Sequence, residues 1–238
     1  MKLKSILSQV ALSIGAAVLM GTASVASAAA VINGSDFSVG ATTQNIGGLE
    51  WTIVPGTSTF KQKSMGGYTG VGISGGRTND EIDIGEYLTG TALSGTFGIA
   101  GFTLGVLFDG PEFGDWNEIA QITAVRQGGE SIVHTLRADT ATTAVWSGAG
   151  SVTNLSQAVQ NAGAVWSLSG NPFGNFTDFV SISFTALTST FCDPGNTCNN
   201  QSDFTLVQLK TTDVPEPASL ALLGLGLVGL AAARRRKA

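Results

Sequence analysis

Short runs in which apolar and polar residues alternate constrain the fold of this sequence more than any other feature. Leu49, Trp51 and Ile53 share one face of such a run, and segments 102–108 and 180–186 repeat the pattern. A period of two turns one row of side chains toward a core and the other toward solvent, as in a half-buried β-strand. Glycine-rich turn signals separate the runs, and inside this region no long stretch has the period of a helix.

The remaining strand candidates are short segments rich in β-branched and aromatic residues. They are segments 68–73, 86–93, 119–125, 131–136, 143–147, 164–168 and 203–210. About ten short strands at this spacing predict an all-β fold, a β-sandwich of the jelly-roll kind. A signal helix is expected before the sandwich and a transmembrane helix after it.

The first residues are typical of a secretory signal. Lys2 and Lys4 precede an apolar run over residues 6–20, and Ala26-Ser27-Ala28 then supplies the small residues that a signal peptidase requires. We expect cleavage after Ala28. A permanent N-terminal anchor is the alternative, and the shortness of the run disfavours it.

The last residues have the features of a membrane-associated targeting segment. Pro215-Glu216-Pro217 precedes an uncharged stretch over residues 218–233, and Arg234-Arg235-Arg236-Lys237 follows. A helix of that length reaches roughly 24 Å, slightly short of a typical hydrocarbon core. The terminal cations should stay on the cytoplasmic side, so the bulk of the chain is expected across the membrane from them. An ordinary anchor without processing is the alternative.

These three parts, in this order, closely resemble the PEP-CTERM sorting signal of Gram-negative bacteria. In that family a membrane enzyme, exosortase, processes the signal and releases or attaches the protein at the cell surface or in the extracellular polymer matrix. The resemblance implies an exported protein, an exosortase-type partner and a membrane contact through the C-terminal segment. The residues that carry the sorting signal are then Pro215, Glu216, Pro217, Arg234, Arg235 and Arg236.

The charge of the exported part differs from that of the whole chain. The expected organisation is a signal peptide at 1–28, a β-sandwich domain at 29–213 and a sorting and anchor segment at 214–238. The domain holds six basic and sixteen acidic residues, a net charge of −10. Such a surface repels phosphate backbones, so we expect no nucleic-acid partner. Divalent cations and neutral glycans are compatible with it.

Two cysteines lie close together near the end of the domain. Cys192 and Cys198 bracket an Asp-Pro-Gly-Asn turn sequence, and an exported protein meets an oxidising compartment. The sequence therefore predicts a Cys192–Cys198 disulfide that closes a hairpin tip. The loop is so small that the chain-entropy contribution is only roughly 2.4 kcal/mol. A metal site would need further ligands, and none is nearby.

Half of the acidic residues of the domain fall within residues 80–118. Calcium suits carboxylates and carbonyls offered by loops, although the EF-hand spacing is absent. The candidate ligands are Asp80, Glu81, Asp83, Asp109, Glu112, Asp115 and Glu118. An antiparallel arrangement of the strands between them would bring both acidic segments to one end of the sandwich. A solvated acidic face and a glycosidase pair drawn from the same acids are the alternatives.

Two further motifs match the residue patterns of enzyme signatures but lack the structural context that those signatures require. Gly70-Val71-Gly72-Ile73-Ser74-Gly75 resembles a dinucleotide fingerprint, but a loop follows it instead of a helix. Gly72-Ile73-Ser74-Gly75-Gly76 spells a nucleophile elbow, for which His134, the single histidine, would be the base. His134 shares a strand face with Ile132 and Leu136, which favours a packed histidine.

A second, looser resemblance concerns the body of the domain. Segments 69–83, 104–112 and 117–118, together with Ser202-Asp203-Phe204, are similar to PEP-CTERM surface proteins with a lectin-like sandwich. This resemblance implies a fold and no assigned catalytic residues.

The sequence thus predicts an exported structural or binding protein of the cell surface or extracellular matrix, without catalysis and with calcium as the single candidate cofactor. The alternative is a carbohydrate-binding module for extracellular polysaccharide. Trp116, on a polar loop, would then be the stacking platform, because an aromatic ring offers a sugar a flat apolar face. Trp51, Trp146 and Trp166 lie in strands and are expected to pack in the core. A secreted glycan hydrolase is the third hypothesis, for which no base, nucleophile and orienting group stand in a convincing frame.

Overall fold

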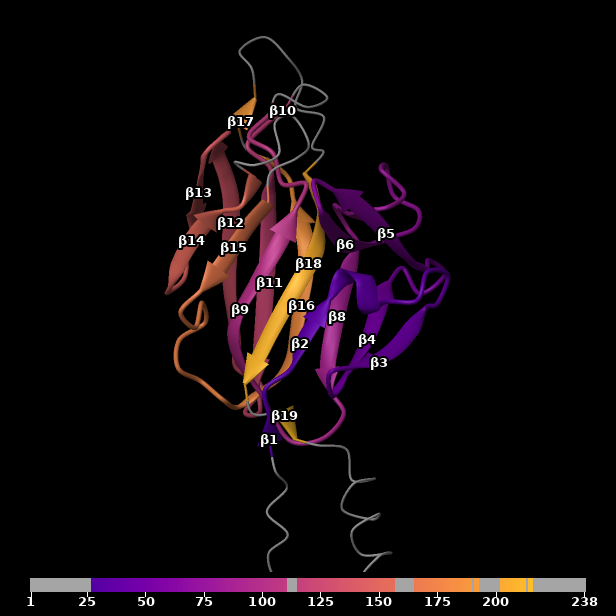
Figure 1. Cartoon of the computed structure of the whole chain (residues 1–238), viewed down its shortest axis with the longest axis vertical. Coiled ribbons are helices and arrows are strands. Elements are labelled where there is room, and N and C mark those ends of the chain that lie inside the picture. Colours follow the sequence, from indigo (N-terminus) through magenta and orange to yellow (C-terminus); the bar gives the residue numbers. More distant parts are fainter. Residues whose placement is uncertain are drawn as a thin grey trace, which may run out of the picture. The chain divides into compact units, whose positions relative to one another are not determined.

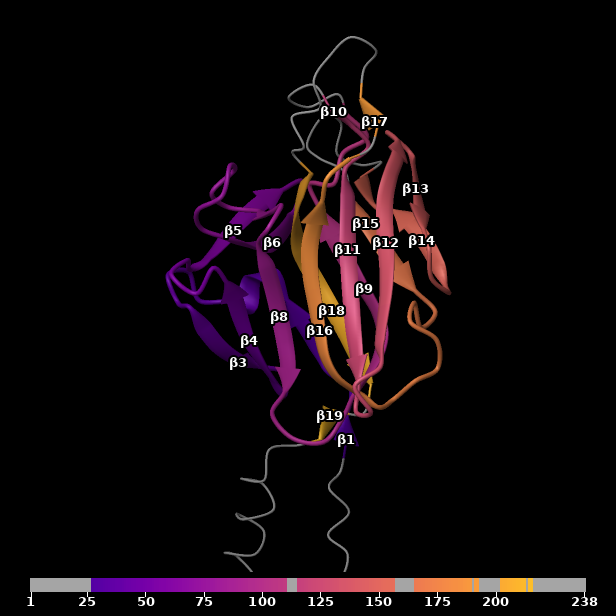
Figure 2. The ribbon, with the colours of Figure 1, turned by 180° about the vertical axis from the view of Figure 1, so that it is seen from behind.

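Two antiparallel sheets packed face to face make up the domain (Figures 1 and 2). The computed structural model describes residues 27–110, 115–156, 165–189, 191–192, 202–212 and 214–215. Ser27–Pro215 forms one compact unit. The expected signal helix and transmembrane helix fall in residues 1–26 and 216–238, outside the described residues.

The first sheet has seven strands in the order β13-β12-β11-β16-β8-β4-β3. Its strands are β3 (Thr43–Ile46), β4 (Leu49–Val54), β8 (Tyr87–Ala92), β11 (Ile119–Arg126), β12 (Ser131–Thr140), β13 (Thr143–Trp146) and β16 (Phe179–Leu187).

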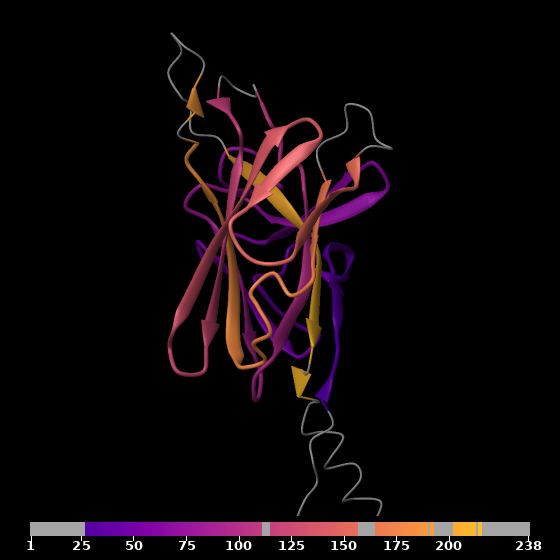
Figure 3. The same cartoon turned by 90° about the vertical axis from the view of Figure 1, so that its left-hand side faces the viewer.

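The second sheet has eight strands along the path β14-β15-β9-β18-β6-β5, with β2 and β7 also paired to β18. Its strands are β2 (Val31–Asn33), β5 (Phe60–Met65), β6 (Tyr68–Ile73), β7 (Ile82–Asp83), β9 (Gly98–Gly105), β14 (Ser151–Asn154), β15 (Val165–Ser169) and β18 (Asp203–Thr212). Figure 3 looks at the edge formed by β13 and β14 and shows the two layers side by side.

Short elements complete the described fold. β1 (Ser27–Ala28) pairs with β19 (Val214–Pro215), and β10 (Asp115–Trp116) pairs with β17 (Phe191–Cys192). A 3₁₀ turn, η2 (Gly34–Asp36), follows β2. The all-β sandwich is confirmed, and its sheets of seven and eight strands make it larger than an eight-stranded jelly roll.

All ten expected strands are present, and the differences lie in their limits and in the edges. The strand expected at 102–108 runs from Gly98 to Gly105, because Val106 adopts a left-handed φ of 64° that ends the strand. Two short strands paired to β18, β2 and β7, were not expected. Strands β3, β5 and β14 were also missed. Each lies at a sheet edge, where only part of the strand is buried and the apolar pattern is weak.

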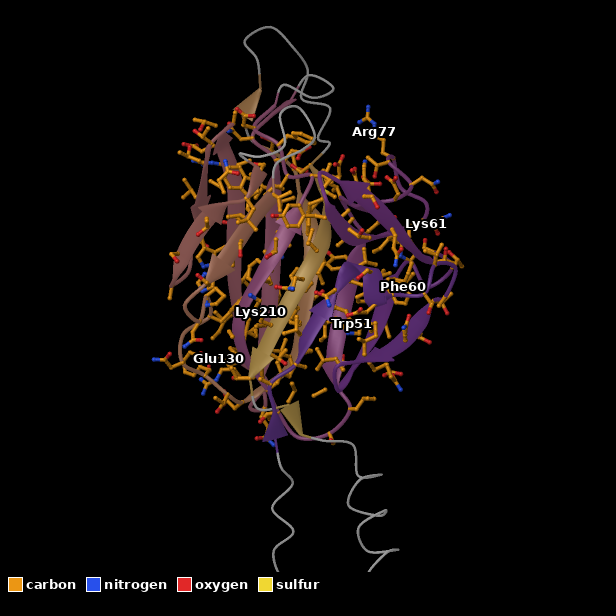
Figure 4. All side chains as sticks on the ribbon, viewed as in Figure 1. Trp51, Phe60, Lys61, Arg77, Glu130 and Lys210 are labelled. Atoms are coloured by element: carbon orange, nitrogen blue, oxygen red, sulfur yellow. The ribbon has the colours of Figure 1, made fainter. Side chains whose placement is uncertain are left out.

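Aromatic rings fill the space between the sheets. Phe102 of β9 and Phe184 of β16 come from opposite sheets, with their ring centroids 6.0 Å apart. The ring of Phe37 packs edge-on against Trp51 and against Phe60, at 5.2 Å from each (the latter two are labelled in Figure 4). Trp51 and Trp166 are fully buried and Trp146 is half-buried against the core, which confirms the expectation for these three tryptophans.

The two fully buried tryptophans differ in their hydrogen bonding, which allows a matched test. Trp166 Nε1 donates to Leu107 O at 2.8 Å, whereas Trp51 Nε1 has no hydrogen-bond partner among the described residues. Phenylalanine at either position removes ring volume and leaves a cavity. Only Trp166→Phe also strands a buried carbonyl, so we expect it to lower the free energy of unfolding by about 1–2 kcal/mol more than Trp51→Phe. Urea denaturation of both variants measures this difference, and equal losses would contradict it.

Candidate functional sites

Both acidic segments lie at the same end of the sandwich, as the antiparallel arrangement predicts. Asp83 of β7 pairs with Asp203 at the start of β18, and Gly105 at the end of β9 pairs with Thr205 two residues further along β18. The turn before β7 and the loop after β9 therefore meet at the end where β18 begins. Arg77 in Figure 4 marks this acidic end.

Asp83 organises the turn that precedes it. Its carboxylate accepts hydrogen bonds from the backbone N–H of Arg77 at 2.5 Å and of Thr78 at 3.1 Å, and from Thr78 Oγ1 at 3.2 Å. Gly76 is required here, because a Cβ at this position would lie 1.9 Å from Asp83 Oδ2 and its φ of +55° favours glycine. The Asp83 carboxylate therefore holds the turn closed.

Glu86 is buried beside Asp83. Its Oε2 accepts a hydrogen bond from the Asp83 backbone N–H at 3.0 Å. Burial raises the pKa of Glu86 from 4.5 to about 7, and the negative charge of Asp83 adds to the increase while the backbone hydrogen bond opposes it. This carboxyl group therefore changes its protonation state near neutral pH.

Glu81 and Asp80 are paired with the one basic side chain that reaches them in the described structure. Lys63 Nζ forms an ion pair with the buried Glu81 carboxylate and lies 3.5 Å from Asp80 Oδ1. Burial lowers the pKa of the Lys63 ammonium, but its hydrogen bonds and charge interactions with Glu81 and Asp80 outweigh burial and raise this pKa above its ordinary value. The ion pair joins β5 to the turn before β7.

The second acidic segment is described in part. Glu118 is buried, and its Oε2 accepts a hydrogen bond from the Phe108 backbone N–H at 2.5 Å. The Asp109 carbonyl accepts a hydrogen bond from the Asn117 backbone N–H at 3.1 Å, which closes the base of the loop. Glu112 lies outside the described residues, as does the side chain of Asp115.

The described acids are used mainly as acceptors for protein donors. Within the described ranges, no three His, Cys, Asp or Glu side chains are placed so that they could hold one metal ion. The calcium interpretation of Asp80, Glu81, Asp83, Asp109, Glu112, Asp115 and Glu118 stays a prediction. Melting curves in calcium and in chelator, at matched ionic strength, would test it.

The other predicted residues at this end have only their backbone described. Trp116 of β10 pairs with Phe191 of β17, and Asp115 pairs with Cys192. The Trp116 ring and the Cys192 side chain are not described, and Cys198 lies outside the described residues. The stacking role of Trp116 and the Cys192–Cys198 disulfide therefore stay predictions.

The two apparent enzyme motifs have structural roles. Gly70 and Gly72 lie in β6, where a Cβ would meet Thr205 Oγ1 at 2.1 Å and the Asp80 carbonyl at 2.2 Å, so close packing requires these glycines. Ser74 Oγ accepts a hydrogen bond from the Thr59 backbone N–H at 2.7 Å. These contacts account for the glycine spacing without a bound nucleotide.

His134 is far from Ser74 in the topology. It lies on β12 of the seven-stranded sheet, and its Nδ1 is 3.3 Å from Ser147 Oγ. Its ring packs against those of Trp146 and Phe173 at 5.2 and 5.3 Å. Burial lowers the pKa of His134. The packed histidine that the sequence favours is therefore the one observed.

Sequence reasoning missed the cleft beside the loop between β15 and β16. This loop, residues 170–178, runs along the end of the sandwich opposite the acidic end (the orange loop at the lower left of Figure 1). A cleft of about 230 Å³ opens beside it. Asn171-Pro172 is a turn signal at the start of this loop, but nothing in the local sequence indicated that Phe176 would stay exposed.

The β-sandwich is followed by a short C-terminal segment that combines a Pro-Glu-Pro triplet, an uncharged stretch and a basic end. Residues 213–237 match the PEP-CTERM protein-sorting motif, which confirms the resemblance of the tail. The match begins one residue after the end of β18 at Thr212. Neither the comparison with curated proteins nor that with solved structures found a match, so the lectin-like body stays a prediction.

The motif places the chain in a class of exported proteins. It implies export and membrane anchoring in a Gram-negative bacterium, with sorting by an exosortase. In the part of the chain that the structure describes, no helix is long and apolar enough to cross a membrane.

Protonation of Glu86 makes the stability of the folded domain depend on pH, and the direction of this dependence can be predicted. Because its pKa in the folded state, about 7, lies above the ordinary value of 4.5, the folded state retains the proton between these values. The contribution of this group to stability is therefore present below about pH 4.5 and is lost as the pH rises through 7. We expect Glu86→Gln to raise the melting temperature by a few degrees at pH 8 and to change it little at pH 5.

Thermal unfolding followed by circular dichroism at the two pH values measures this effect. Glu50→Gln is the matched control, because Glu50 is exposed on β4 at a distance from the acidic end. An equal effect of Glu86→Gln at both pH values would show that its protonation is not coupled to folding.

Proposed function

We propose that the chain is a non-catalytic structural or binding protein of the cell surface or extracellular polymer matrix, delivered there by its C-terminal signal. The observation that carries this proposal is the junction between the domain and the motif. β18 pairs with β9, β6, β2 and β7, and the sorting motif begins directly after it. The motif therefore follows the last long strand of the sandwich directly, and the sandwich itself is the unit that is sorted.

The roles of the former candidate catalytic residues support the non-catalytic assignment. Ser74 bonds to Thr59, His134 contacts Ser147 and two aromatic rings, and Asp83 closes a turn. Each of these side chains has a partner that holds the fold together. A structural role accounts for all of them.

Glycan binding is the second candidate function. The acidic surface disfavours polyanions, and the domain holds a cleft lined by uncharged residues beside the exposed ring of Phe176. This cleft favours a neutral polysaccharide as the binding partner. Glycan hydrolysis is the third candidate and would require a pair drawn from the acids of residues 80–118.

The sorting step is tested by changing the motif. Replacing Pro215, Glu216 and Pro217 together by alanine should remove the protein from the surface and matrix fractions and leave it in the membrane and periplasmic fractions. Immunoblots of fractionated cells measure the distribution, with Glu50→Gln as a control that leaves the motif intact. An unchanged distribution would contradict sorting by these residues.

Processing makes a separate prediction about mass. If the motif is cleaved, protein recovered from the surface or matrix lacks Arg234, Arg235, Arg236 and Lys237. Intact mass spectrometry of the recovered protein measures this loss. A surface protein that retains the arginine cluster would show that the segment acts as an uncleaved anchor.

A further inference from the structure

The cleft beside the loop 170–178 has the composition of a site for a small neutral ring. Its polar lining comes from Asn171, Asn175, Thr177 and Thr212, and its aromatic wall is Phe176. The volume of about 230 Å³ is below the roughly 300–1,000 Å³ of sites that enclose a drug-sized ligand. One ring of a larger molecule therefore suits the cleft better than a long segment.

Phe176 is exposed and yet held in place. Its side chain is 40% exposed, and its ring packs edge-on against Phe179 with centroids 6.1 Å apart. Phe179 in turn lies 6.0 Å from Phe173, which packs against Trp146 at 5.8 Å. Phe176 is thus the exposed end of a row of rings that begins in the core, so little conformational entropy is lost when a ligand stacks on it.

Arg126 fixes the same ring from another element. Its guanidinium carbon lies 4.1 Å from the centroid of Phe176, in a cation–π contact. The guanidinium also donates to both carboxylate oxygens of Asp178, at 2.9–3.1 Å, and it pairs with Glu130. These bonds tie β11 to the end of the loop. Glu130, labelled in Figure 4, marks this end of the sandwich.

The loop backbone is fixed as well. The Asn171 N–H donates to Ala100 O at 3.3 Å, the Gly174 N–H donates to Asn171 O at 2.7 Å, and Pro172 O accepts the Ala149 N–H at 3.1 Å. Asn171 adopts a left-handed φ of 57°, a conformation that asparagine tolerates better than most residues. The cleft is therefore formed before any ligand arrives.

Its polar groups retain hydrogen-bonding capacity. Asn171 Nδ2 donates to Asn175 Oδ1 at 2.6 Å, which orients the two amides. In the described part of the chain, no protein group bonds to Asn171 Oδ1, Asn175 Nδ2 or the hydroxyls of Thr177 and Thr212. The cleft thus offers an acceptor, a donor and two hydroxyls beside an aromatic ring.

The charge around the cleft disfavours an anionic ligand. No residue of its lining is charged. Arg126, whose guanidinium contacts the Phe176 ring, is paired with Asp178 and Glu130. Lys210, two residues before Thr212 on β18, is exposed, but the net charge of the domain, −10, disfavours an anionic ligand.

We propose that this cleft binds one neutral sugar residue of an extracellular polysaccharide, with the C–H face of the sugar on Phe176 and its hydroxyls on Asn171, Asn175 and Thr177. The assignment rests on the proposed function as a surface or matrix protein, which it deepens. A sugar ring combines an apolar face with several hydroxyls, and this is the combination that an aromatic ring beside amides and hydroxyls recognises.

The test is affinity electrophoresis of the full chain, purified in detergent, through native gels. The gels contain dextran, galactomannan, or polysaccharide extracted from the matrix of the producing cells, and alginate serves as the anionic comparison. We expect retardation in at least one neutral polysaccharide and none in alginate. Phe176→Ala should weaken this binding about tenfold, Asn175→Ala should weaken it severalfold, and Phe176→Trp should retain it.

Tyr87→Ala is the matched control, because Tyr87 is also an exposed aromatic residue, 42% exposed, but lies on β8 away from the cleft. Melting curves of each variant show whether it is folded. If Phe176→Ala fails to fold, Asn175→Ala and Phe176→Trp decide the matter, since Asn175 is exposed and tryptophan keeps the ring.

Two results would overturn the proposal. The first is wild-type protein that no neutral polysaccharide retards. The second is retardation that folded Phe176→Ala and Asn175→Ala variants leave unchanged, which would place glycan binding elsewhere on the domain. Neither result affects surface or matrix localisation, which cell fractionation measures independently, so the failure of this site and the failure of the proposed function are distinguishable.

Discussion

The pairing of β18 with its neighbours is the constraint on which the rest of the structure depends. β18 runs ten residues through the middle of its sheet, is buried along most of its length and pairs with β9, β6, β2 and β7. Its first residues lie at the acidic end, and its last residue, Thr212, lines the cleft at the other end. Burial of this strand therefore fixes the relative positions of both sites, and a defect in its pairing would disturb both together.

Buried carboxylates explain why the acidic end is organised as it is. Removing an ionised carboxylate from water costs several kcal/mol unless donors or a counter-charge replace the water. Glu81 is stabilised by Lys63, Asp83 by the turn at Arg77 and Thr78, and Glu118 by the Phe108 backbone. Glu86 reduces the same cost by keeping its proton up to about pH 7. The acids form one group in the sequence. In the structure, a different local partner offsets the desolvation cost of each buried carboxylate.

The sequence predicted those parts of the fold in which burial is two-sided or strictly alternating. The strand at 49–54, with Leu49, Trp51 and Ile53 buried, was readable because its alternation survives in the structure. β5 was missed because only Phe60 and Met65, at its two ends, are buried, so its sequence FKQKSM has no strand period. Edge strands lack one neighbour, and their side chains are selected for solvent as much as for packing.

The candidate sites were likewise predictable only in part: their place in the fold could be predicted, but their side-chain contacts could not. Antiparallel topology was enough to bring residues 80–86 and 105–110 to one end. The partners of each acid were not predictable, because Lys63 and Glu81 meet through the pairing of β5 and β6, and β5 itself was missed. The cleft could not be read from the sequence either. Phe176 looks like any core phenylalanine, and its contact with Arg126, fifty residues earlier on β11, cannot be read from the local sequence.

The junction at Thr212 connects the architecture with delivery to the cell surface. Thr212 lines the cleft, and the sorting motif begins at the next residue, so ligand contact and attachment are adjacent along the chain. A polymer held in the cleft would load the domain at the same strand end through which the domain is attached. β18 is suited to this load because its register with β9 extends from Thr205 to Thr212, so many hydrogen bonds share a force along the strand. A site on an edge strand such as β5 or β14 would transmit the same force through a single neighbour. Attachment through the central strand is therefore compatible with the structural or binding role proposed above.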